Sequence, residues 1–241
     1  MNNPFDKVKA GLRSLLRRHS ILVTRYPLQD CLKHLCPKTI LDVGANIGQY
    51  GLELRNLGFR GMIHSFEPFL PAFSSLQKVA TQSRPHDAWQ CYNYGLGDKE
   101  SEEVMHVSRM SPFNSLREPL PQSVKLHAGI VSTDTVPIKV KTLDAIWPQL
   151  DCADKPVLLK IDTQGYELPI LQGGKTILPM ISAIQLEVSF TPLYRGQPCI
   201  EELVPFMRGQ GFVVYGLWPT GIRDEQARLF EADCIFVRAK S

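Results

Sequence analysis

Short apolar runs and amphipathic segments alternate along most of the chain. Apolar runs that fit strands are followed by stretches with helical spacing, and glycines end several of these segments. The pattern predicts strands at residues 39–43, 62–66, 88–96, 157–161, 184–188, 212–217 and 234–238. It predicts helices at residues 49–57, after Pro68 and at residues 201–208. Strands alternating with helices indicate an α/β fold, a parallel sheet with helices on both faces.

Two parts of the chain depart from this alternation. No convincing helix separates residues 212–217 from residues 234–238, so we expect these strands to pair antiparallel at one end of the sheet. In the longest connection, residues 102–108 and 136–140 alternate like half-exposed strands. Because connections of this length are often functional, we expect residues 105–135 to form a lid over the active site.

The N-terminal residues 5–18 have the pattern of a basic amphipathic helix, FDKVKAGLRSLLRR. We therefore predict a helical extension at residues 1–37, followed by a single domain at residues 38–241. Contact with an anionic membrane surface is one interpretation of the basic helix. Packing on the main domain is the other, and the absence of tryptophan from this short segment favours it.

Composition narrows the class of protein. Of the 241 residues, 44% are hydrophobic and 21% are charged, which are globular proportions. The net charge of +3 argues against a nucleic-acid-binding protein. No apolar run is long enough to span a bilayer, the first residues lack a signal-peptide pattern, and the six cysteines lack metal-binding spacing. We expect free thiols and a cytoplasmic protein.

The strongest chemical signal is the turn Asp42-Val-Gly-Ala-Asn-Ile-Gly48, between a predicted strand and a predicted helix. Gly44 and Gly48 would let the backbone pass close to a ligand, and the helix that follows presents free N–H groups. A dinucleotide fingerprint has glycine where Asn46 stands, because the pyrophosphate lies there. The turn therefore favours S-adenosylmethionine, whose amino-acid end Asn46 could bind, over a nicotinamide dinucleotide.

Other candidate cofactor-binding residues follow neighbouring strands. Glu67 is placed to accept hydrogen bonds from both ribose hydroxyls, and the turn Gly95-Leu-Gly-Asp98 could frame the adenine. The complete predicted set is Asp42, Gly44, Ala45, Asn46, Gly48, Tyr50, Glu67, Pro68, Gly95, Leu96, Asp98 and Asp162.

The chain resembles the FkbM family of S-adenosylmethionine-dependent methyltransferases. The segments that carry the resemblance are Leu41–Gly48, Phe66–Pro68, Leu159–Leu168 with Gly173-Gly174, Gln185–Val188 and Asp233–Phe236. The most specific of them contains the string K-I-D-x-x-G-x-E. The resemblance covers residues 38–238. It implies a class I, Rossmann-like methyltransferase fold, and methyl transfer to a hydroxyl of a sugar, a glycan or another natural product.

An alcohol is a poor methyl acceptor until its proton leaves, so a base or a metal is expected. Strand alternation puts Lys160 and Asp162 on one side, and Asp162 should meet Glu187 at the carboxyl edge of the sheet. Asp162 could act as the base, bind the cofactor's amino group, or share a divalent cation such as Mg²⁺ with Glu187. Structural alternatives are a helix cap near Tyr166 for Asp162 and an ion pair with Lys160 for Glu187.

Further candidates surround this predicted catalytic set of Asp162, Glu187, Tyr166 and Lys160. Tyr166 could line the acceptor pocket, His106 and His127 could supply a base, and Tyr194 and Arg195 could bind the acceptor. Three other functions stay open: a nicotinamide-dependent oxidoreductase, an inactive methyltransferase-like scaffold and an N-methyltransferase. The chain has no Asn/Asp-Pro-Pro-aromatic segment to hold an amine, which favours oxygen as the acceptor atom.

Overall fold

The computed structural model describes residues 27–83, 88–150, 152, 156–219 and 223–239. The amphipathic segment at residues 5–18 lies outside these residues, so its contact with a membrane surface stays a prediction. Within the described ranges, no helix is long and apolar enough to cross a membrane. All six cysteines are free.

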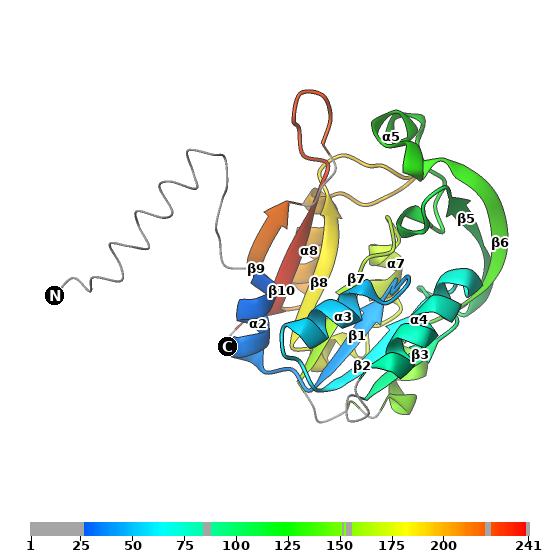
Figure 1. Ribbon diagram of the computed structural model, residues 1–241. Helices are drawn as coiled ribbons and strands as arrows, with labels where there is room; N and C mark the ends of the chain where they lie inside the picture. Colours follow the sequence, from blue (N-terminus) through cyan, green and yellow to red (C-terminus); the bar gives the residue numbers. More distant parts are fainter. Residues whose placement is uncertain (1–26, 84–87, 151, 153–155, 220–222, 240–241) are drawn as a thin grey trace, which may run out of the picture.

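A seven-stranded sheet forms the centre of the protein (Figure 1). In spatial order its strands are β3 (Trp89–Tyr92), β2 (Met62–Phe66), β1 (Thr39–Val43), β7 (Val157–Ile161), β8 (Ala183–Ser189), β10 (Glu231–Arg238) and β9 (Phe212–Pro219). Neighbours from β3 to β8 are parallel, and β10 runs antiparallel to both β8 and β9. The predicted mostly parallel sheet with an antiparallel last strand is confirmed.

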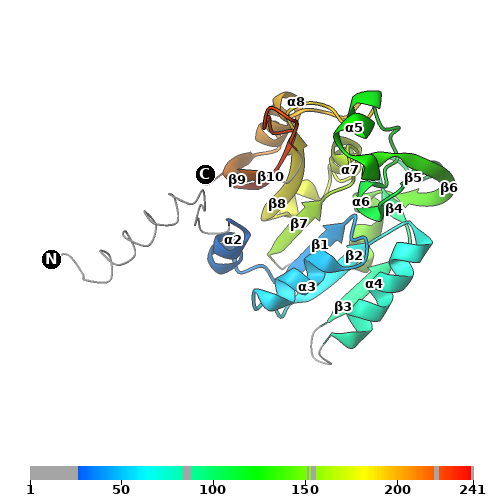
Figure 2. The ribbon, with the colours of Figure 1, turned by 45° about the horizontal axis from the view of Figure 1, so that its top comes forward.

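Helices cover both faces of this sheet (Figures 1 and 2). One face carries α2 (Pro27–Leu35), α3 (Gln49–Asn56) and α4 (Leu70–Gln82). The other carries α6 (Leu143–Ile146), α7 (Glu167–Gln172) and α8 (Ile200–Gly209), with the short 3-10 turns η3 (Trp147–Gln149) and η4 (Leu178–Met180). The larger core lies on the α7 and α8 side, where β1, β7, β8 and β10 present buried apolar residues. Burial of this apolar surface is the main force that holds the sheet and helices together.

A second, three-stranded sheet stands beside the first. Its order is β4 (Gly95–Leu96), β6 (Ser132–Lys141) and β5 (Ser101–Ser108). The prediction of one continuous strand at residues 88–96 is therefore wrong. The partner strand β2 ends at Phe66, opposite Tyr92, and the chain then leaves the main sheet and pairs with β6 instead.

The predicted strands at residues 102–108 and 136–140 are confirmed, and they pair antiparallel as β5 and β6. The connection between them contains η1 (Ser111–Phe113), α5 (Pro121–Leu126) and η2 (Ala128–Ile130). This insertion extends beyond the carboxyl ends of β7 and β8, so it forms one wall of the region where ligands of such sheets bind.

Candidate functional site

A pocket of about 660 Å³ lies at the carboxyl ends of β1, β2 and β7. The turn after β1, the end of β2, strand β4, the turn after β7 and the insertion all contribute to its lining. The position agrees with the rule that open α/β sheets bind ligands beyond the carboxyl ends of their strands.

The predicted cofactor-binding residues divide into two groups. The pocket lining includes Gly44, Asn46, Glu67, Pro68, Gly95, Leu96 and Asp162. The others lie elsewhere: Asp42 and Tyr50 belong to a buried network on the α3 face, Ala45 is buried in the turn, Gly48 starts α3, and Asp98 is exposed beyond β4.

The two turn glycines also have a packing reason in the structure. A Cβ on Gly44 would lie 1.9 Å from the backbone oxygen of Asp162, and one on Gly48 would lie 3.0 Å from Leu76. Both glycines also have positive φ angles, 76° and 93°. Gly44 is therefore needed for the close approach of β1 to the end of β7, and Gly48 for the packing of α3 against α4, while the binding of a ligand at this turn stays a prediction.

Glu67 closes the turn from the end of β2. Its Oε2 accepts the backbone N–H of Asn46 at 2.8 Å, and its Oε1 accepts that of Phe69 at 2.8 Å. Burial raises the pKa of Glu67 to about 7, and these two hydrogen bonds oppose the rise. Each oxygen keeps a second lone pair, so the carboxylate can accept two further hydrogen bonds on the pocket side.

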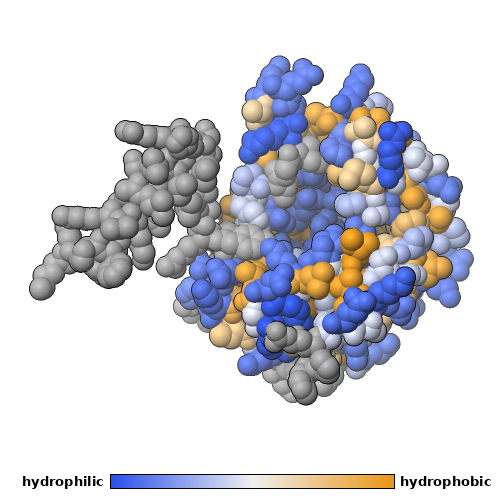
Figure 3. Space-filling model, viewed as in Figure 1, coloured by the Kyte–Doolittle hydropathy of each residue, from blue (hydrophilic) through white to orange (hydrophobic). Residues whose placement is uncertain are grey.

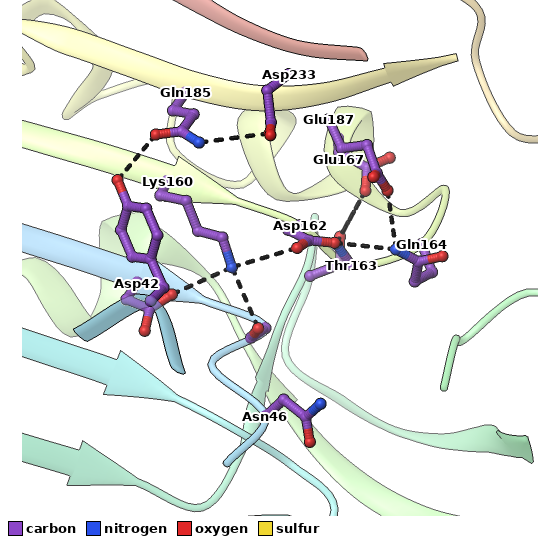
Figure 4. Close-up of polar contacts among 12 residues, drawn as sticks. Asp42, Asn46, Lys160, Asp162, Thr163, Gln164, Glu167, Gln185, Glu187 and Asp233 are labelled. Atoms are coloured by element: carbon purple, nitrogen blue, oxygen red, sulfur yellow. Dashed lines mark hydrogen bonds and ion pairs between the residues drawn. The ribbon is translucent and has the colours of Figure 1, made fainter. Parts of the chain in front are cut away.

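Lys160 is the buried cation of the site (Figure 4). Its Nζ lies 3.2 Å from Asp42 Oδ1 and 3.5 Å from Asp162 Oδ2, and it donates to the backbone oxygen of Gly44 at 3.3 Å. Burial alone would lower the pKa of Lys160, but Asp42 and Asp162 raise it above its ordinary value. The suggested pair of Lys160 with Glu187 is wrong: Lys160 instead joins the carboxylates of β1 and β7.

The α3 face of the sheet carries a row of polar side chains at its carboxyl half. Tyr50 donates to Gln185 at 2.8 Å, and Gln185 donates to Asp233 at 3.4 Å. In the strand register, Lys160 lies beside Gln185, and Asp233 lies opposite Glu187. Central strands of a parallel sheet are usually apolar on both faces, so this polar row departs from the usual pattern.

Asp162 and Glu187 do converge, as expected, and a single amide joins them. Gln164 Nε2 donates to Asp162 Oδ1 at 3.0 Å and to Glu187 Oε2 at 2.8 Å (Figure 4). Within the part of the chain that the structure describes, no group of three or more His, Cys, Asp or Glu side chains could hold a metal ion. The arrangement thus gives no support to a Mg²⁺ site at Asp162 and Glu187.

Glu167, and not Asp162, stabilises the turn before α7. Glu167 Oε1 accepts the backbone N–H groups of Thr163 and Gly165 at 3.0 and 3.2 Å, and the Thr163 hydroxyl at 3.1 Å. The helix cap suggested for Asp162 is not formed, since α7 begins at Glu167 without a side-chain cap. Asp162 keeps a side chain that is 40% exposed and lines the pocket.

Five carboxyl groups around this site have raised pKa values. Burial is the largest cause for each, and neighbouring carboxylates add to it. The pKa of Asp233 rises to about 6, that of Glu67 to about 7 and that of Glu231 to about 8. Glu167 and Glu187 are shifted in the same direction. The folded protein therefore holds protons that the unfolded chain would release.

These raised pKa values predict that the free protein loses stability as the pH rises from 6 to 8. The stabilising contribution is complete below the unfolded pKa values near 4, and it is lost as the pH rises through the folded values of 6 to 8. For each pH unit over which one carboxyl group is protonated only in the folded state, the free energy of unfolding falls by about 1.4 kcal/mol. We expect Tm to fall by at least about 3 °C between pH 6 and pH 8, measured by calorimetry. A rise in Tm over this interval would contradict the assignment.

The insertion covers the pocket and is bonded to the strand ends at several points. Ser111 donates to Asn46 Oδ1 at 3.0 Å across the pocket. Ser115 donates to the backbone oxygen of Gln164 at 2.7 Å, and Arg117 Nε donates to that of Gly165 at 2.6 Å. Residues of the insertion thus line the pocket, and the role of residues 105–135 as a lid stays a prediction. Opening of the segment would have to break these hydrogen bonds, and whether it opens stays a prediction.

A hollow lies between this insertion and the loop that connects β9 to β10. Figure 3 shows hydrophilic residues lining it between α5 and that loop. Side chains from both walls, among them Gln122, Lys125, Arg223 and Arg228, border a groove there of about 1,160 Å³. Most of the residues that line the groove are hydrophilic.

Four of the five remaining candidates lie outside the pocket lining, and the fifth, Tyr166, belongs to it. Tyr194 is fully buried, and Arg195 is exposed and pairs with Glu118 at 2.9 Å. His127 accepts the N–H of Gly129 at 3.1 Å and packs against Phe113. His106 pairs through its backbone with Ser115. Tyr166 does line the pocket, beneath the guanidinium of Arg117 at 5.4 Å from the ring centroid.

Known proteins resemble this chain in sequence. A family model described as the methyltransferase FkbM domain matches residues 42–214. A curated protein from Beauveria bassiana (strain ARSEF 2860), called Methyltransferase 1, is 24% identical over 143 residues, which are 56% of this chain and 57% of the relative. The chain thus matches little more than half the length of that relative.

Two solved structures share the fold. An FkbM methyltransferase from Methylobacillus flagellatus KT aligns with a TM-score of 0.53 and 17% identity, over 83% of this chain and 43% of the other. Magnesium protoporphyrin IX methyltransferase from Synechocystis PCC 6803, solved with bound SAM, aligns with a TM-score of 0.50 and 10% identity, over 99% and 86% of the two chains. Both support the class I methyltransferase architecture.

Proposed function

Because the chain belongs to the FkbM family of methyltransferases, we propose that it transfers a methyl group from S-adenosylmethionine to a hydroxyl of a sugar, a glycan or another natural product. The observation that carries the proposal is the pocket between the turn after β1, Glu67 and Asp162. It combines hydrogen-bonding groups for a cofactor with a carboxylate that an acceptor could reach.

The pocket residues fit S-adenosylmethionine in three respects. Glu67 has free lone pairs for the two ribose hydroxyls. Leu96 and Met105 line the pocket and supply apolar surface for the adenine. Asn46 lines it with a polar side chain that suits the amino-acid end, and it stands where a pyrophosphate would need glycine. When bound, the cofactor supplies an electrophilic methyl group on a sulfonium.

Asp162 is the proposed general base. Its carboxylate is the most exposed member of the Lys160 network, and it lines the pocket. It would accept the proton that the acceptor hydroxyl gives up, which makes the oxygen a competent nucleophile. The hydrophilic groove between α5 and the β9–β10 loop favours a polar acceptor such as a glycan.

The change Glu67→Gln tests the cofactor site. It keeps the shape of the side chain, but it removes the negative charge and one acceptor. Because hydrogen bonds to a charged group contribute about 1.5–3 kcal/mol, we expect the affinity for S-adenosylmethionine to fall roughly 10- to 100-fold, measured by equilibrium dialysis. Glu100→Gln, at an exposed residue that is not part of the pocket lining, is the matched control and should bind like wild type. Equal affinity in both variants would remove Glu67 from the site.

Methyl transfer itself separates the acceptor classes. Wild-type protein is incubated with methyl-labelled S-adenosylmethionine and a panel of free sugars, phenols and amines. We expect label to enter hydroxyl-bearing sugars as methyl ethers. Label that enters amines alone would contradict oxygen as the acceptor atom and would favour an N-methyltransferase.

A further inference from the structure

Gln164 has a backbone conformation that its own side chain makes costly. Its φ angle is 57°, in the left-handed region that glycine and asparagine adopt more readily. The residue is buried, with 7% of its surface exposed. Strained residues of this kind persist where the surrounding structure requires a particular side chain, and they gather at functional sites.

The side chain of Gln164 makes three hydrogen bonds, and all of them go to groups of the site. Its Nε2 donates to Asp162 and to Glu187, and its Oε1 accepts from the Tyr194 hydroxyl at 3.0 Å. Tyr194 lies fully buried below it, 3.2 Å from the backbone oxygen of Phe113 in the insertion. One amide therefore connects two carboxylates of neighbouring strands with the segment that covers the pocket.

In the orientation that the structure shows, the N–H groups of the amide face oxygens of Asp162 and Glu187, and its Oε1 faces the Tyr194 hydroxyl. The reversed amide would place Oε1 against the Asp162 carboxylate oxygen, so that two acceptors would face each other. Lys160 holds the other oxygen of Asp162 at 3.5 Å. Between them, Lys160 and Gln164 fix the direction in which the Asp162 carboxylate faces the pocket (Figure 4).

We propose that Gln164 is a positioning residue, which holds Asp162 and Glu187 side by side so that Asp162 can take the proton of the acceptor hydroxyl. The proposal rests on the proposed function, since it assumes a methyl acceptor in the pocket. It differs from a purely structural role, in which Gln164 would only connect the turn after β7 to the insertion. The two roles predict different results for a variant that suits the backbone and lacks the amide.

Gln164→Gly is that variant, because glycine adopts a φ of 57° without strain. We expect its Tm to fall by several degrees, since relief of strain offsets only part of the lost hydrogen bonds. Its KM for S-adenosylmethionine should change less than about 3-fold, while kcat falls roughly 100-fold because the base is no longer held in place. Gln164→Asn keeps an amide and tolerates this φ, but its side chain is one methylene shorter, so it should recover only part of kcat.

Cys36→Gly is the matched control. Cys36 has a φ of 45°, and it is exposed beyond α2, outside the pocket. Its change to glycine should leave both kcat and KM unchanged. If Gln164→Gly keeps the kcat of wild type, the positioning role is excluded, and a fall in Tm alone would assign Gln164 a structural role.

A second measurement needs no acceptor. In wild-type protein, the side-chain NH₂ signals of Gln164, identified by their absence from Gln164→Gly, should exchange slowly with solvent in NMR spectra. They should shift in Glu187→Gln and broaden in Tyr194→Phe. Signals typical of a free glutamine side chain would overturn the proposal whatever the activity. If wild type fails to bind S-adenosylmethionine but the Gln164 NH₂ signals still exchange slowly, the proposed function is wrong, whereas the hydrogen bonds of Gln164 are confirmed.

Discussion

Asp162→Asn is expected to lower kcat by roughly 100- to 10,000-fold, the usual effect of losing one general base. The amide keeps the shape of the carboxylate but cannot accept a proton from the acceptor. Asp162 lines the pocket and is held by Lys160 and Gln164, so its replacement should change the cofactor affinity only modestly. Steady-state kinetics together with calorimetric binding of S-adenosylmethionine would measure both quantities.

Chelation adds a second arm to this experiment. A metal-dependent reaction would stop in EDTA and recover with added magnesium, whereas a carboxylate base is indifferent to EDTA. Because the Gln164 amide lies between Asp162 and Glu187, we expect indifference. Near-normal turnover of Asp162→Asn would exclude Asp162 as the base and direct the search to Tyr166, which also lines the pocket, and to His106 and His127 in the insertion.

Lys160→Met should be among the most destabilising single changes on the α3 face. Lys160 is buried, and its partner Asp42 is fully buried, so the variant leaves the Asp42 carboxylate without its cation. Removing one partner of a buried ion pair costs about 3–5 kcal/mol in the free energy of unfolding, because a buried charge loses its compensation. Urea denaturation would measure this loss.

Two companion variants separate charge from packing. Lys139→Met removes an exposed lysine of β6 and should stay within about 0.5 kcal/mol of wild type. The double variant Asp42→Asn/Lys160→Met removes both charges and should recover at least about half of the loss. A loss below about 1 kcal/mol in Lys160→Met would show that the ion pair contributes little to folding.

The sequence predicted those strands correctly whose bounds depend only on the hydrophobic pattern of the segment itself. Strands at residues 39–43, 62–66 and 157–161 match the structure to the residue, because each is a short apolar run beside a turn. The error at residues 88–96 arose because a continuous apolar pattern cannot show where the partner strand ends. The pairing changes there because β2 ends opposite Tyr92, and β6 is the strand that pairs with β4.

The sequence predicted the two carboxyl residues of the candidate site, but it did not predict the glutamine that lies between them. Asp162 and Glu187 converge because both end parallel neighbours, which alternation can predict. Gln164 was missed because its role depends on a left-handed turn and on Tyr194, thirty residues further along the chain. The sequence held one indication of a polar site on the sheet. In the predicted strand at residues 184–188, every second residue is polar, whereas a central strand of a parallel sheet is usually apolar.

The most direct test of the central claim is a calorimetric titration of the full wild-type chain with S-adenosylmethionine, its demethylated product and NAD in parallel. The pocket beside Asn46 and Glu67 predicts saturable binding of the first two at one site per chain, and no binding of NAD. Saturable binding of NAD with none of S-adenosylmethionine would contradict the account.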